Sequence, residues 1–445
     1  MKDSQELTQK RYISMMLPFM LATVTQPLLG AVDTAVIGMT GDAAAIAGVS
    51  LGANLFNTLY WLFGFLRVTT TGQSARVQEL GQGEARTRSF FLPLFFAQII
   101  GSLFLVMQRP VLGGYLLMTG AETAVQEHIR QYYRILIWGA PFVLSNYVIL
   151  GWLMGQSGVK ASLFMQVSSN AVNMVLDYWF VVRLGGGMRG VAAATLIAQV
   201  YSCLCGSILM MRYGVFGRID LSGVWNQGQV GSLLRQNRDL MLRTVCLLIH
   251  NNVFAMMGAR MGTGILAVNS ILLQITSIEA YLFEGIANTS SVFAGAALGR
   301  SSPGLLREVM RKTLFWSVGT AGMITVLQLA AGNSFLRIFT HMEDLLLLAG
   351  HYQLYCYFYP FVAAVGLTYY GIYTGTGMTG PVFKSTVMAL AVFLPVCLIG
   401  VKAAGNDGLW LAYLTFYGGR SAGLYYYRSQ IAMKDCSSSL REEFG

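Results

Sequence analysis

The sequence predicts an all-α polytopic membrane protein with twelve transmembrane helices in two six-helix lobes. Composition is one reason, because 55% of the 445 residues are hydrophobic and only 11% are charged, whereas about a quarter of an average soluble domain is charged. A second is that apolar runs of roughly 20 residues, enough for a helix to cross a bilayer, recur along the chain. The third is that motifs in the two halves match. The alternating pattern of a membrane β-barrel is absent.

Twelve hydrophobic runs are separated by charged or glycine-rich breaks. Each is long enough for one membrane-spanning helix, and an even number of spans places both ends of the chain on the same side of the membrane. We expect spans near residues 13–38, 46–69, 88–108, 124–152, 161–182, 190–211, 241–262, 264–289, 313–331, 346–373, 382–402 and 407–428.

The longest polar stretch, residues 212–240, lies between the sixth and seventh runs. Its scattered Leu, Val and Trp residues suggest a partly amphipathic surface segment. We therefore expect an N-terminal lobe over residues 1–211, a cytoplasmic linker over residues 212–240, and a C-terminal lobe with a cytoplasmic tail over residues 241–445.

Most of the 30 Lys and Arg residues fall on the side of the predicted helices that also holds both termini. Cytoplasmic loops are enriched in Lys and Arg, so we expect a multi-pass protein of the cell (inner or plasma) membrane with both termini in the cytoplasm. The same loops account for the net charge of +10. Because no basic-aromatic module accompanies that charge, no nucleic-acid partner is expected.

Short motifs recur half a chain apart. The motif Pro-Phe-Val that begins at Pro141 recurs at Pro360, and Gly158 matches Gly377 with the same offset. Each half holds six helices, an even number, so the two copies have the same orientation in the membrane. This is the parallel internal repeat of transporters that have a central cavity between their lobes.

Four acidic side chains are predicted at membrane depth: Asp33, Asp177, Glu279 and Glu284. Ionisable groups there cost roughly 2.5–3.5 kcal/mol each on insertion scales, so they are functional candidates by default. Asp33 follows Pro27 and Gly30 in the first run. A proline removes a helix hydrogen bond and a nearby glycine adds freedom, which predicts a hinge beside this acid.

A polar stripe follows the fifth run. Asn170, Asn173 and Asp177 stand at i, i+3 and i+7 and share one helical face, and Thr195 in the sixth run is a candidate to extend it. An amide can donate to a carboxylate and accept from a carboxylic acid, so the face suits a proton- or cation-coupling site. The alternative is that these side chains only join helices, as polar residues commonly do in membranes.

The two lobes are predicted to hold different acids. In the C-terminal half, Glu284 shares a polar stripe with Tyr281, and both are candidates to bind substrate. The counterparts expected from the repeat are Asn251 or Asn252 for Asp33, Val396 or Pro395 for Asp177, and Phe65 or Leu66 for Glu284. We expect Asn251 and Asn252 to contribute to substrate binding.

Aromatic residues supply further candidates for substrate binding. Tyr132 and Tyr133 in the fourth run, with Asn57 in the second, are expected to line a cavity for flat, cationic or amphipathic ligands; the alternative is ordinary packing. Enzyme motifs are absent, and the six cysteines lack metal-ligand spacing. We expect no enzyme activity, no metal and no cofactor beyond a coupling ion, which is H⁺ or Na⁺.

Five segments carry a resemblance to a known family: PLLGAVDTAVIG, LRVTTTGQSARVQELGQGE, LGWLMGQSGVKA, SNAVNMVLDYWFV and GARMGTGILAVNSILLQ. Over nearly the whole chain, they resemble the multidrug and toxic compound extrusion (MATE) family, in its DNA-damage-inducible protein F (DinF) branch. The resemblance implies two lobes around a cavity that opens alternately to each side. It also implies that Asp33 is a coupling acid, with Asn173, Asp177 and Thr195 as its network and Pro27 at the bend.

The resulting hypothesis is a secondary active antiporter that exports small organic, drug-like compounds, often cationic or amphipathic, in exchange for protons. Sodium coupling is an alternative, since carboxylate, amide and hydroxyl oxygens also bind hard cations. A lipid-linked precursor flippase is another, although it needs a cationic cavity and few Lys or Arg residues lie deep in the runs. A non-transporting scaffold would leave the buried acids unexplained. The expected partners are small organic substrates and the lipid bilayer, and the expected state is a monomer.

Overall fold

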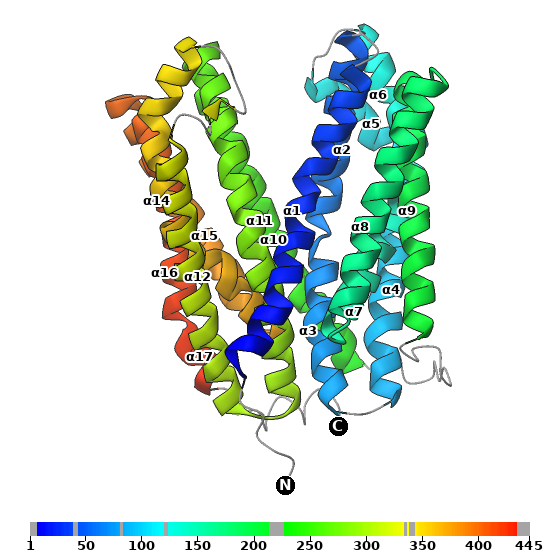
Figure 1. Ribbon diagram of the computed structural model, residues 1–445, viewed down its shortest axis with the longest axis vertical. Coiled ribbons are helices and arrows are strands. Elements are labelled where there is room, and N and C mark those ends of the chain that lie inside the picture. The colour runs from blue at the N-terminus through cyan, green and yellow to red at the C-terminus, as the bar shows by residue number, and fades with distance from the viewer. Residues whose placement is uncertain are drawn as a thin grey trace. The chain divides into compact units, whose positions relative to one another are not determined.

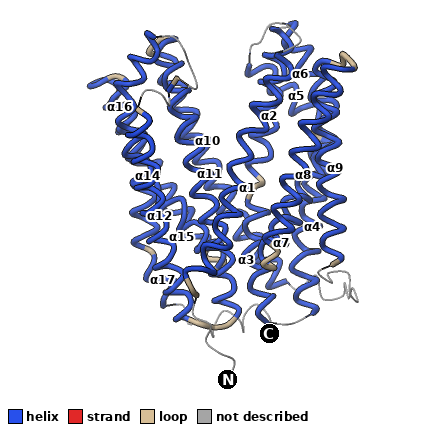
Figure 2. Tube along the Cα trace, in the orientation of Figure 1, coloured by secondary structure: helices blue, strands red, loops and turns tan. Residues whose placement is uncertain are grey.

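The computed structural model describes residues 7–38, 43–80, 83–119, 123–212, 227–332, 336–337 and 343–433. Within the helices, the side chains of residues 25–35, 37–38, 43–47, 83–84, 118, 227–230, 232–234, 263, 430 and 432–433 lie outside this description. The described part is built of long helices joined by short turns and contains no strand (Figures 1 and 2). The predicted all-α fold is confirmed.

The first half of the chain forms six helical segments, three of them interrupted. The helices are α1 (Gln9–Gly38), α2 (Ala43–Leu62), α3 (Phe65–Leu80), α4 (Gly83–Val106), α5 (Gln108–Thr119), α6 (Thr123–Leu136), the 3₁₀ turn η1 (Ile137–Gly139), α7 (Ala140–Gly155), α8 (Val159–Asp177), the π-helix η2 (Tyr178–Arg183) and α9 (Gly187–Met211). Pro141 lies in the first turn of α7, where a missing N–H costs no helix hydrogen bond.

The second half also forms six long segments, and these are continuous helices. They are α10 (Gln227–Arg260), α11 (Thr263–Gly299), α12 (Pro303–Ala331), α14 (Glu343–Gly375), α15 (Thr379–Ala404) and α16 (Asn406–Tyr426), followed by the short α17 (Arg428–Met433). All twelve predicted spans thus have a helical counterpart among the described residues. The helices often extend beyond the spans, because hydropathy detects only the apolar part of a helix whose ends are polar.

Contacts between the helices divide the chain into two compact units. We call Val24–Asn226 the N-terminal unit, and Gln227–Gly445 together with Met1–Thr23 the C-terminal unit. The expected N-terminal lobe over residues 1–211 therefore differs from the N-terminal unit at its beginning, since the first half of α1 packs with the second half of the chain. The expected linker over residues 212–240 differs as well, because α10 already begins at Gln227; residues 213–226 lie outside the described part.

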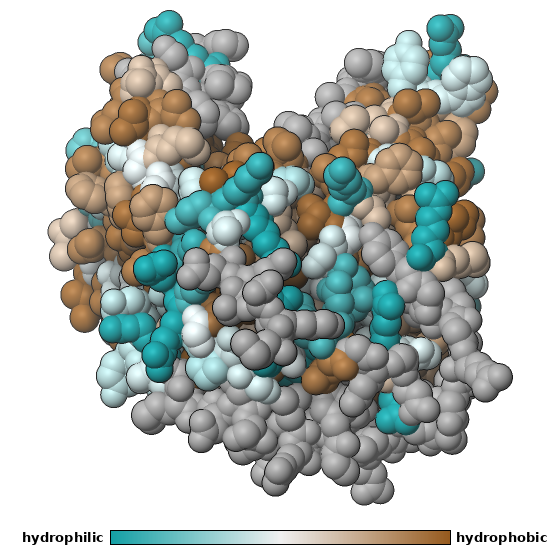
Figure 3. Space-filling model, turned by 60° about the horizontal axis from the view of Figure 1, so that its bottom comes forward, coloured by the Kyte–Doolittle hydropathy of each residue, from teal (hydrophilic) through white to brown (hydrophobic). Residues whose placement is uncertain are grey.

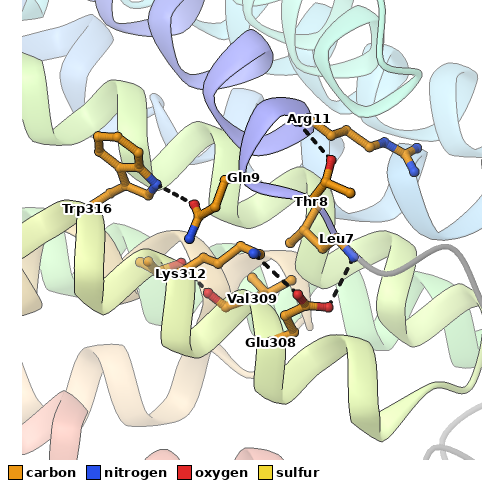
Figure 4. Close-up of polar contacts among 9 residues, drawn as sticks. Leu7, Thr8, Gln9, Arg11, Glu308, Val309, Lys312 and Trp316 are labelled. Atoms are coloured by element: carbon orange, nitrogen blue, oxygen red, sulfur yellow. Dashed lines mark hydrogen bonds and ion pairs between the residues drawn. The ribbon is translucent and has the colours of Figure 1, made fainter.

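Polar contacts hold the start of α1 within the C-terminal unit (Figure 4). The Leu7 backbone N–H donates to Glu308 Oε2 at 3.0 Å, and Glu308 also forms an ion pair with Lys312. The Trp316 indole N–H donates to Gln9 Oε1 at 3.1 Å. These partners all belong to α12, so contacts that are distant in sequence place the start of α1 in the C-terminal unit.

Further along α1, side-chain contacts join it to α11 and α12. The Tyr12 hydroxyl lies 2.9 Å from Ser290 Oγ and 3.2 Å from Thr313 Oγ1. The Thr23 hydroxyl donates to the carbonyl oxygen of Tyr281 at 2.7 Å, and a Cβ on Gly285 would clash with the backbone of Met20. The first half of α1 is therefore an integral helix of the C-terminal unit.

The same helix packing occurs in both units and fixes the register of the internal repeat. In α7, Gly151 packs against the carbonyl of Arg67 and Gly155 against the carbonyl of Thr71, both on α3. The pair α14 and α11 repeats these contacts, with Gly371 against Ala287 and Gly375 against Ser291. Small residues four apart let helices approach closely in a membrane. The repeat expected from the sequence is therefore present, and Gly151 corresponds to Gly371.

The capping turns correct one predicted equivalence. Gly158 N–H donates to Leu153 O at the end of α7, and Met378 N–H donates to Tyr373 O at the end of α14, both at 2.9 Å. The residues just before them, Ser157 and Gly377, both have positive φ, 57° and 72°. Gly377 is thus equivalent to Ser157, not to Gly158, and matching the two glycines placed the repeat one residue out of register.

The corrected register changes all three predicted counterparts. By the offset of 220 residues, the counterpart of Asp33 is Val253 rather than Asn251 or Asn252. The helix α8 begins at Val159 and α15 at Thr379, so the counterpart of Asp177 is Cys397 rather than Val396 or Pro395. The counterpart of Glu284 becomes Gly64 rather than Phe65 or Leu66. Gly64 lies in the turn that separates α2 from α3, whereas Glu284 lies within the continuous α11.

Apolar surface is abundant. Hydrophobic side chains cover broad parts of the face shown in Figure 3, and large apolar residues such as Leu204 and Ile208 of α9 and Val326 and Leu327 of α12 are more than half exposed. Eight helical segments among the described residues are long and apolar enough to cross a membrane. Such exposure is expected of helices that face lipid.

Candidate coupling and substrate-binding residues

The polar stripe on α8 becomes more buried toward its end. Asn170 is partly buried, Asn173 is 1% exposed and Asp177 is 0% exposed. Asp177 is the last residue before the π-helix η2, and π-helical turns are frequent at functional sites. The expectation that the three side chains share an inward face of one helix agrees with this burial.

A neighbouring helix contributes to the same place. The Asn173 side-chain N–H₂ donates to Thr195 Oγ1 on α9 over a long 3.5 Å, and the Thr195 hydroxyl donates to Val191 O at 3.0 Å. The other amide atom, Asn173 Oδ1, is buried without a hydrogen-bond partner in the described part of the chain. This leaves a free oxygen beside a buried acid.

A second amide extends this polar region along α9. Gln199 stands one turn after Thr195, and its Oε1 is also buried without a partner among the described residues. Asn146 of α7 donates to the Gln199 backbone carbonyl at 3.0 Å, and a Cβ on Gly139 would clash with Gln199 Oε1. The missing side chain at Gly139 therefore makes room for this amide.

The predicted hinge and first coupling acid lie in α1. Pro27, Gly30 and Asp33 fall within its helical backbone, in the N-terminal unit. Their side chains lie outside the described residues, so their proposed roles rest on sequence alone.

Tyr132 and Tyr133 form a packed aromatic cluster with Phe56 and Tyr60. The ring of Phe56 stacks on Tyr133 at 5.2 Å and meets the edge of Tyr132 at 6.2 Å. Both tyrosines are at most 2% exposed, and the hydroxyls of Tyr60 and Tyr133 have no hydrogen-bond partner in the described part. Asn57, the next residue after Phe56, is exposed. The cluster has a packing role, while contact with substrate stays a prediction.

In the C-terminal unit, the most buried acid is Glu279 of α11. It is 4% exposed, and its Oε1 accepts a 2.5 Å hydrogen bond from the side-chain amide of Gln328 on α12, while Oε2 has no partner among the described residues. Glu284 and Tyr281 are only partly buried. Sequence reasoning favoured Glu284, and the lone glutamine in the ninth span was the available sign of a partner for Glu279.

The predicted asparagine pair on α10 is exposed. Asn252 donates to Leu248 O at 2.7 Å, and Asn251 Oδ1 lies 3.0 Å from His250 Nδ1. His250 itself is 0% exposed and stacks on the ring of Phe416 at 3.9 Å. Both amides therefore already have local partners, and their contact with substrate stays a prediction.

Sequence reasoning also passed over a buried arginine. Arg420 lies inside the twelfth predicted span, on α16, and is 1% exposed. Its Nε and Nη2 atoms have no hydrogen-bond partner in the described part. An arginine near the end of a membrane helix commonly extends its charged group to the membrane surface, so the sequence alone does not mark Arg420 as buried.

The fold and these polar clusters define a class: a polytopic membrane transporter with ionisable groups buried among its helices. Among the described residues, no group of three His, Cys, Asp or Glu side chains is placed to hold a metal ion.

The MatE family model matches residues 18–179 and 240–399, one segment in each half. The last residues of these two segments, 179 and 399, are separated by the same offset as Gly151 and Gly371. The chain belongs to this family, whose members are membrane transporters and not enzymes. It is 32% identical to the DNA damage-inducible protein F of Escherichia coli (strain K12) over 92% of this chain and 89% of that protein.

More distant relatives and solved structures are also similar to this chain. Protein DETOXIFICATION 44 (chloroplastic) of Arabidopsis thaliana is 24% identical over 91% of this chain and 79% of that protein. A crystal structure of MATE in the bent conformation superposes with a TM-score of 0.85 at 20% identity, covering 95% of both chains. A mutant of the Vibrio cholerae MATE transporter VcmN gives a TM-score of 0.83 at 16% identity, over 98% of this chain and 97% of that one. The twelve-helix, two-lobe fold expected from the sequence is confirmed.

Proposed function

We propose that this multidrug efflux protein is a proton-coupled antiporter of small organic compounds, often cationic or amphipathic, that works by alternating access. The observation that carries the proposal is the burial of Asp177 beside Asn173 and Thr195 in the N-terminal unit. A charged carboxylate in such a place is costly, so the site favours proton uptake, and a proton is released when the surroundings become more polar.

The neighbouring amides tolerate both states of the acid. An amide N–H₂ can donate to a carboxylate, and an amide oxygen can accept from a carboxylic acid. Asn173 offers such an oxygen, since its Oδ1 has no partner within the described residues. The membrane potential supplies enough energy to drive coupled transport, because one elementary charge that crosses 100 mV is worth about 2.3 kcal/mol.

The helix α1 can couple protonation of the acids to a change in conformation. Its first half belongs to the C-terminal unit and its second half to the N-terminal unit, and Pro27, Gly30 and Asp33 lie just after that division. We infer that protonation of Asp33 and Asp177 alters the bend of α1 and favours release of substrate outward.

Reconstituted protein in liposomes tests the proposal, with ethidium as the transported cation. A proton gradient should drive ethidium uptake against its own gradient, and Asp33→Asn and Asp177→Asn should each lower the initial rate at least about tenfold. Asparagine imitates the neutral acid in size, so both variants should fold. Asp344→Asn, which changes an exposed acid at the start of α14, is the matched control. Full proton-driven rates in both test variants would refute the coupling role.

Sodium is the second candidate ion. Asn173 Oδ1, the Thr195 hydroxyl and the Asp177 carboxylate are oxygen donors of the kind that hard cations prefer. Replacing the proton gradient by a sodium gradient at equal pH on both sides separates the two ions. Uptake driven by sodium alone, and lost in Asp177→Asn, would assign the site to sodium.

Orientation, membrane and oligomeric state belong to the proposal too. We expect a monomer in the cell membrane with both termini in the cytoplasm, because most Lys and Arg residues lie on that side of the spans. Labelling of Cys436 in the C-terminal tail by an impermeant maleimide should require permeabilised cells; labelling of intact cells would reverse the orientation.

A further inference from the structure

The C-terminal unit contains a buried guanidinium that has no ion-pair partner in its described surroundings. Arg420 of α16 is 1% exposed, yet its Nε and Nη2 atoms find no hydrogen-bond partner in the part of the chain that the structure describes. An unpaired buried charge costs several kcal/mol in the free protein. A side chain kept in that state is poised for a ligand of opposite charge.

A second arginine reinforces the positive charge. Arg243 of α10 is close enough to Arg420 to interact with it electrostatically. Its guanidinium carbon lies 4.4 Å from the ring centroid of Tyr370 on α14, and its Nε is likewise buried without a partner among the described residues. Two cations that repel each other share one region of the unit.

Neither arginine forms an ion pair within the described residues. The acid nearest in sequence is Asp239, one helical turn before Arg243, but it pairs with Arg238 at 3.0 Å and accepts from the Thr379 hydroxyl at 3.2 Å. The other groups that act electrostatically on Arg420 are the tyrosines Tyr359, Tyr370 and Tyr417, whose hydroxyls are neutral. His250 also interacts electrostatically with Arg420, and it would add positive charge if it were protonated.

The surroundings of the two arginines are aromatic. The guanidinium carbon of Arg420 lies 5.8 Å from the ring of Phe416 and 5.7 Å from that of Tyr417. Those rings continue into the aromatic group around His250, where Phe393 lies 4.5 Å and Tyr413 5.2 Å from the imidazole. A ligand whose charge reaches Arg420 therefore needs an apolar, preferably flat, body.

The internal repeat argues that packing does not require this arginine. The register fixed by the glycine contacts makes Val200 the counterpart of Arg420. The starts of the two helices, Gly187 of α9 and Asn406 of α16, would make it Tyr201, and neither residue is basic. The N-terminal unit thus builds the same helix without an arginine there. The charge is an addition specific to the C-terminal unit.

We propose that Arg420 and Arg243 form a binding site for the head group of an amphipathic anion, a carboxylate, sulfonate or phosphate attached to an apolar body. Arg420 presents its planar fork of N–H donors, which matches such oxyanions, and the aromatic side chains accept the body. The site lies within the C-terminal unit and is separate from the acids proposed for coupling, so its test needs no transport.

Binding of a charged probe and its neutral analogue tests the site. The full-length protein in phosphatidylcholine nanodiscs should bind 1-naphthaleneacetate at least about tenfold more tightly than 1-naphthaleneacetamide, which differs chiefly in charge. Arg420→Met and Arg243→Met should each remove that preference. Arg428→Met removes a partly exposed arginine of α17, whose N–H donates to Tyr425 O and whose guanidinium lies over the Tyr425 ring, and should retain that preference.

The head group of a membrane lipid is the other source of the same chemistry. If phosphatidylglycerol in the nanodisc displaces the naphthaleneacetate, and native mass spectrometry finds that lipid retained by the wild type but not by Arg420→Met, the anion is a lipid. If phosphatidylglycerol has no effect on the probe, the site serves a soluble organic anion. Equal binding of probe and lipid by the wild type and Arg420→Met would overturn the proposal.

Thermal unfolding distinguishes a binding role of Arg420 from a purely structural one. Because Arg420→Met removes an uncompensated buried charge, the ligand-free variant should unfold at the same temperature as the wild type or higher. A lower midpoint would contradict the proposal for Arg420. Naphthaleneacetate should raise the midpoint of the wild type and of Arg428→Met but not that of Arg243→Met.

Discussion

The two units share their helix packing but not their polar interior. In each, a pair of glycines one helical turn apart lets one helix rest on the backbone of another, at equivalent positions of the repeat. The buried polar groups differ. The N-terminal unit holds Asp177 and Asn173, whereas the C-terminal unit holds Glu279 and Arg420 at positions that have no like counterpart. The close helix packing is thus common to both copies of the repeat. Each of these buried ionisable groups, by contrast, occurs in only one copy.

Two groups of amides, one in each unit, differ in their hydrogen bonds. In the C-terminal unit, Asn269 and Asn406 exchange side-chain hydrogen bonds at 2.8 and 2.9 Å, and Trp410 adds a third at 2.9 Å. In the N-terminal unit, Asn173 makes one long hydrogen bond and keeps a free oxygen in the described part of the site. A fully satisfied amide holds helices together, and a partly satisfied one is available for a proton or an ion.

The largest expected effect tests the shared packing. Gly151→Val and Gly371→Val should each destabilise the protein by about 3 kcal/mol or more, because a side chain would collide with the backbone of the facing helix. Thermal unfolding in detergent measures the loss. Gly319→Ala on α12 is the control, since nothing lies within 4 Å of its added Cβ. Tolerance at Gly151 alone would show that the units do not depend equally on this contact.

The next effect separates structural from functional amides. Asn269→Ala should cost about 2 kcal/mol of stability, because Asn406 and Trp410 lose their partners in a buried place. Asn173→Ala should cost about 0.6 kcal/mol, the typical value for one hydrogen bond in a membrane. The effects on transport should have the reverse order. Asn269→Ala should transport at the wild-type rate per folded molecule, whereas Asn173→Ala should transport more slowly. A stability loss of equal size in both variants would remove the distinction.

A smaller effect concerns the acid of the C-terminal unit. A double-mutant cycle between Glu279→Ala and Gln328→Ala should give a coupling energy of about 1 kcal/mol, because their hydrogen bond is short and buried. The same cycle between Asn173→Ala and Thr195→Ala should give less than about 0.5 kcal/mol, since so long a hydrogen bond is weak. Unfolding midpoints of the four proteins in each cycle supply both values. A larger coupling for the second pair would invert the comparison.

The sequence predicted the fold well because membrane helices are marked by long apolar runs and by glycine and proline motifs. Spacing alone predicted that Asn170, Asn173 and Asp177 share one face of one helix, and their role in coupling stays a prediction. The sequence did less well wherever partners come from different helices. Glu279 of α11 meets Gln328 of α12, and Arg420 of α16 lies near Arg243 of α10. No spacing within a single helix signals either contact.

The boundary between the contact units within α1 likewise has no local signal in the sequence. Hydropathy shows α1 as one uninterrupted run, so nothing local indicates that its first half packs on α11 and α12. The error in the repeat register has another cause. Gly158 and Gly377 occupy positions of the repeat that differ by one residue, so matching them gave a plausible but shifted alignment. The capping hydrogen bonds define the true equivalence.

The smallest expected effect tests that assignment of α1. Tyr12→Phe removes one hydroxyl but leaves Ser290 and Thr313 bonded to each other at 2.8 Å, so the loss should be about 0.6 kcal/mol, near the average for membrane proteins. Ser14, a little further along the helix, is exposed and donates only to its own helix, so Ser14→Ala is the control and should cause no loss. If α1 instead packed with the N-terminal unit alone, Tyr12→Phe would match that control. Its coupling with Thr313→Val in a double-mutant cycle would also vanish.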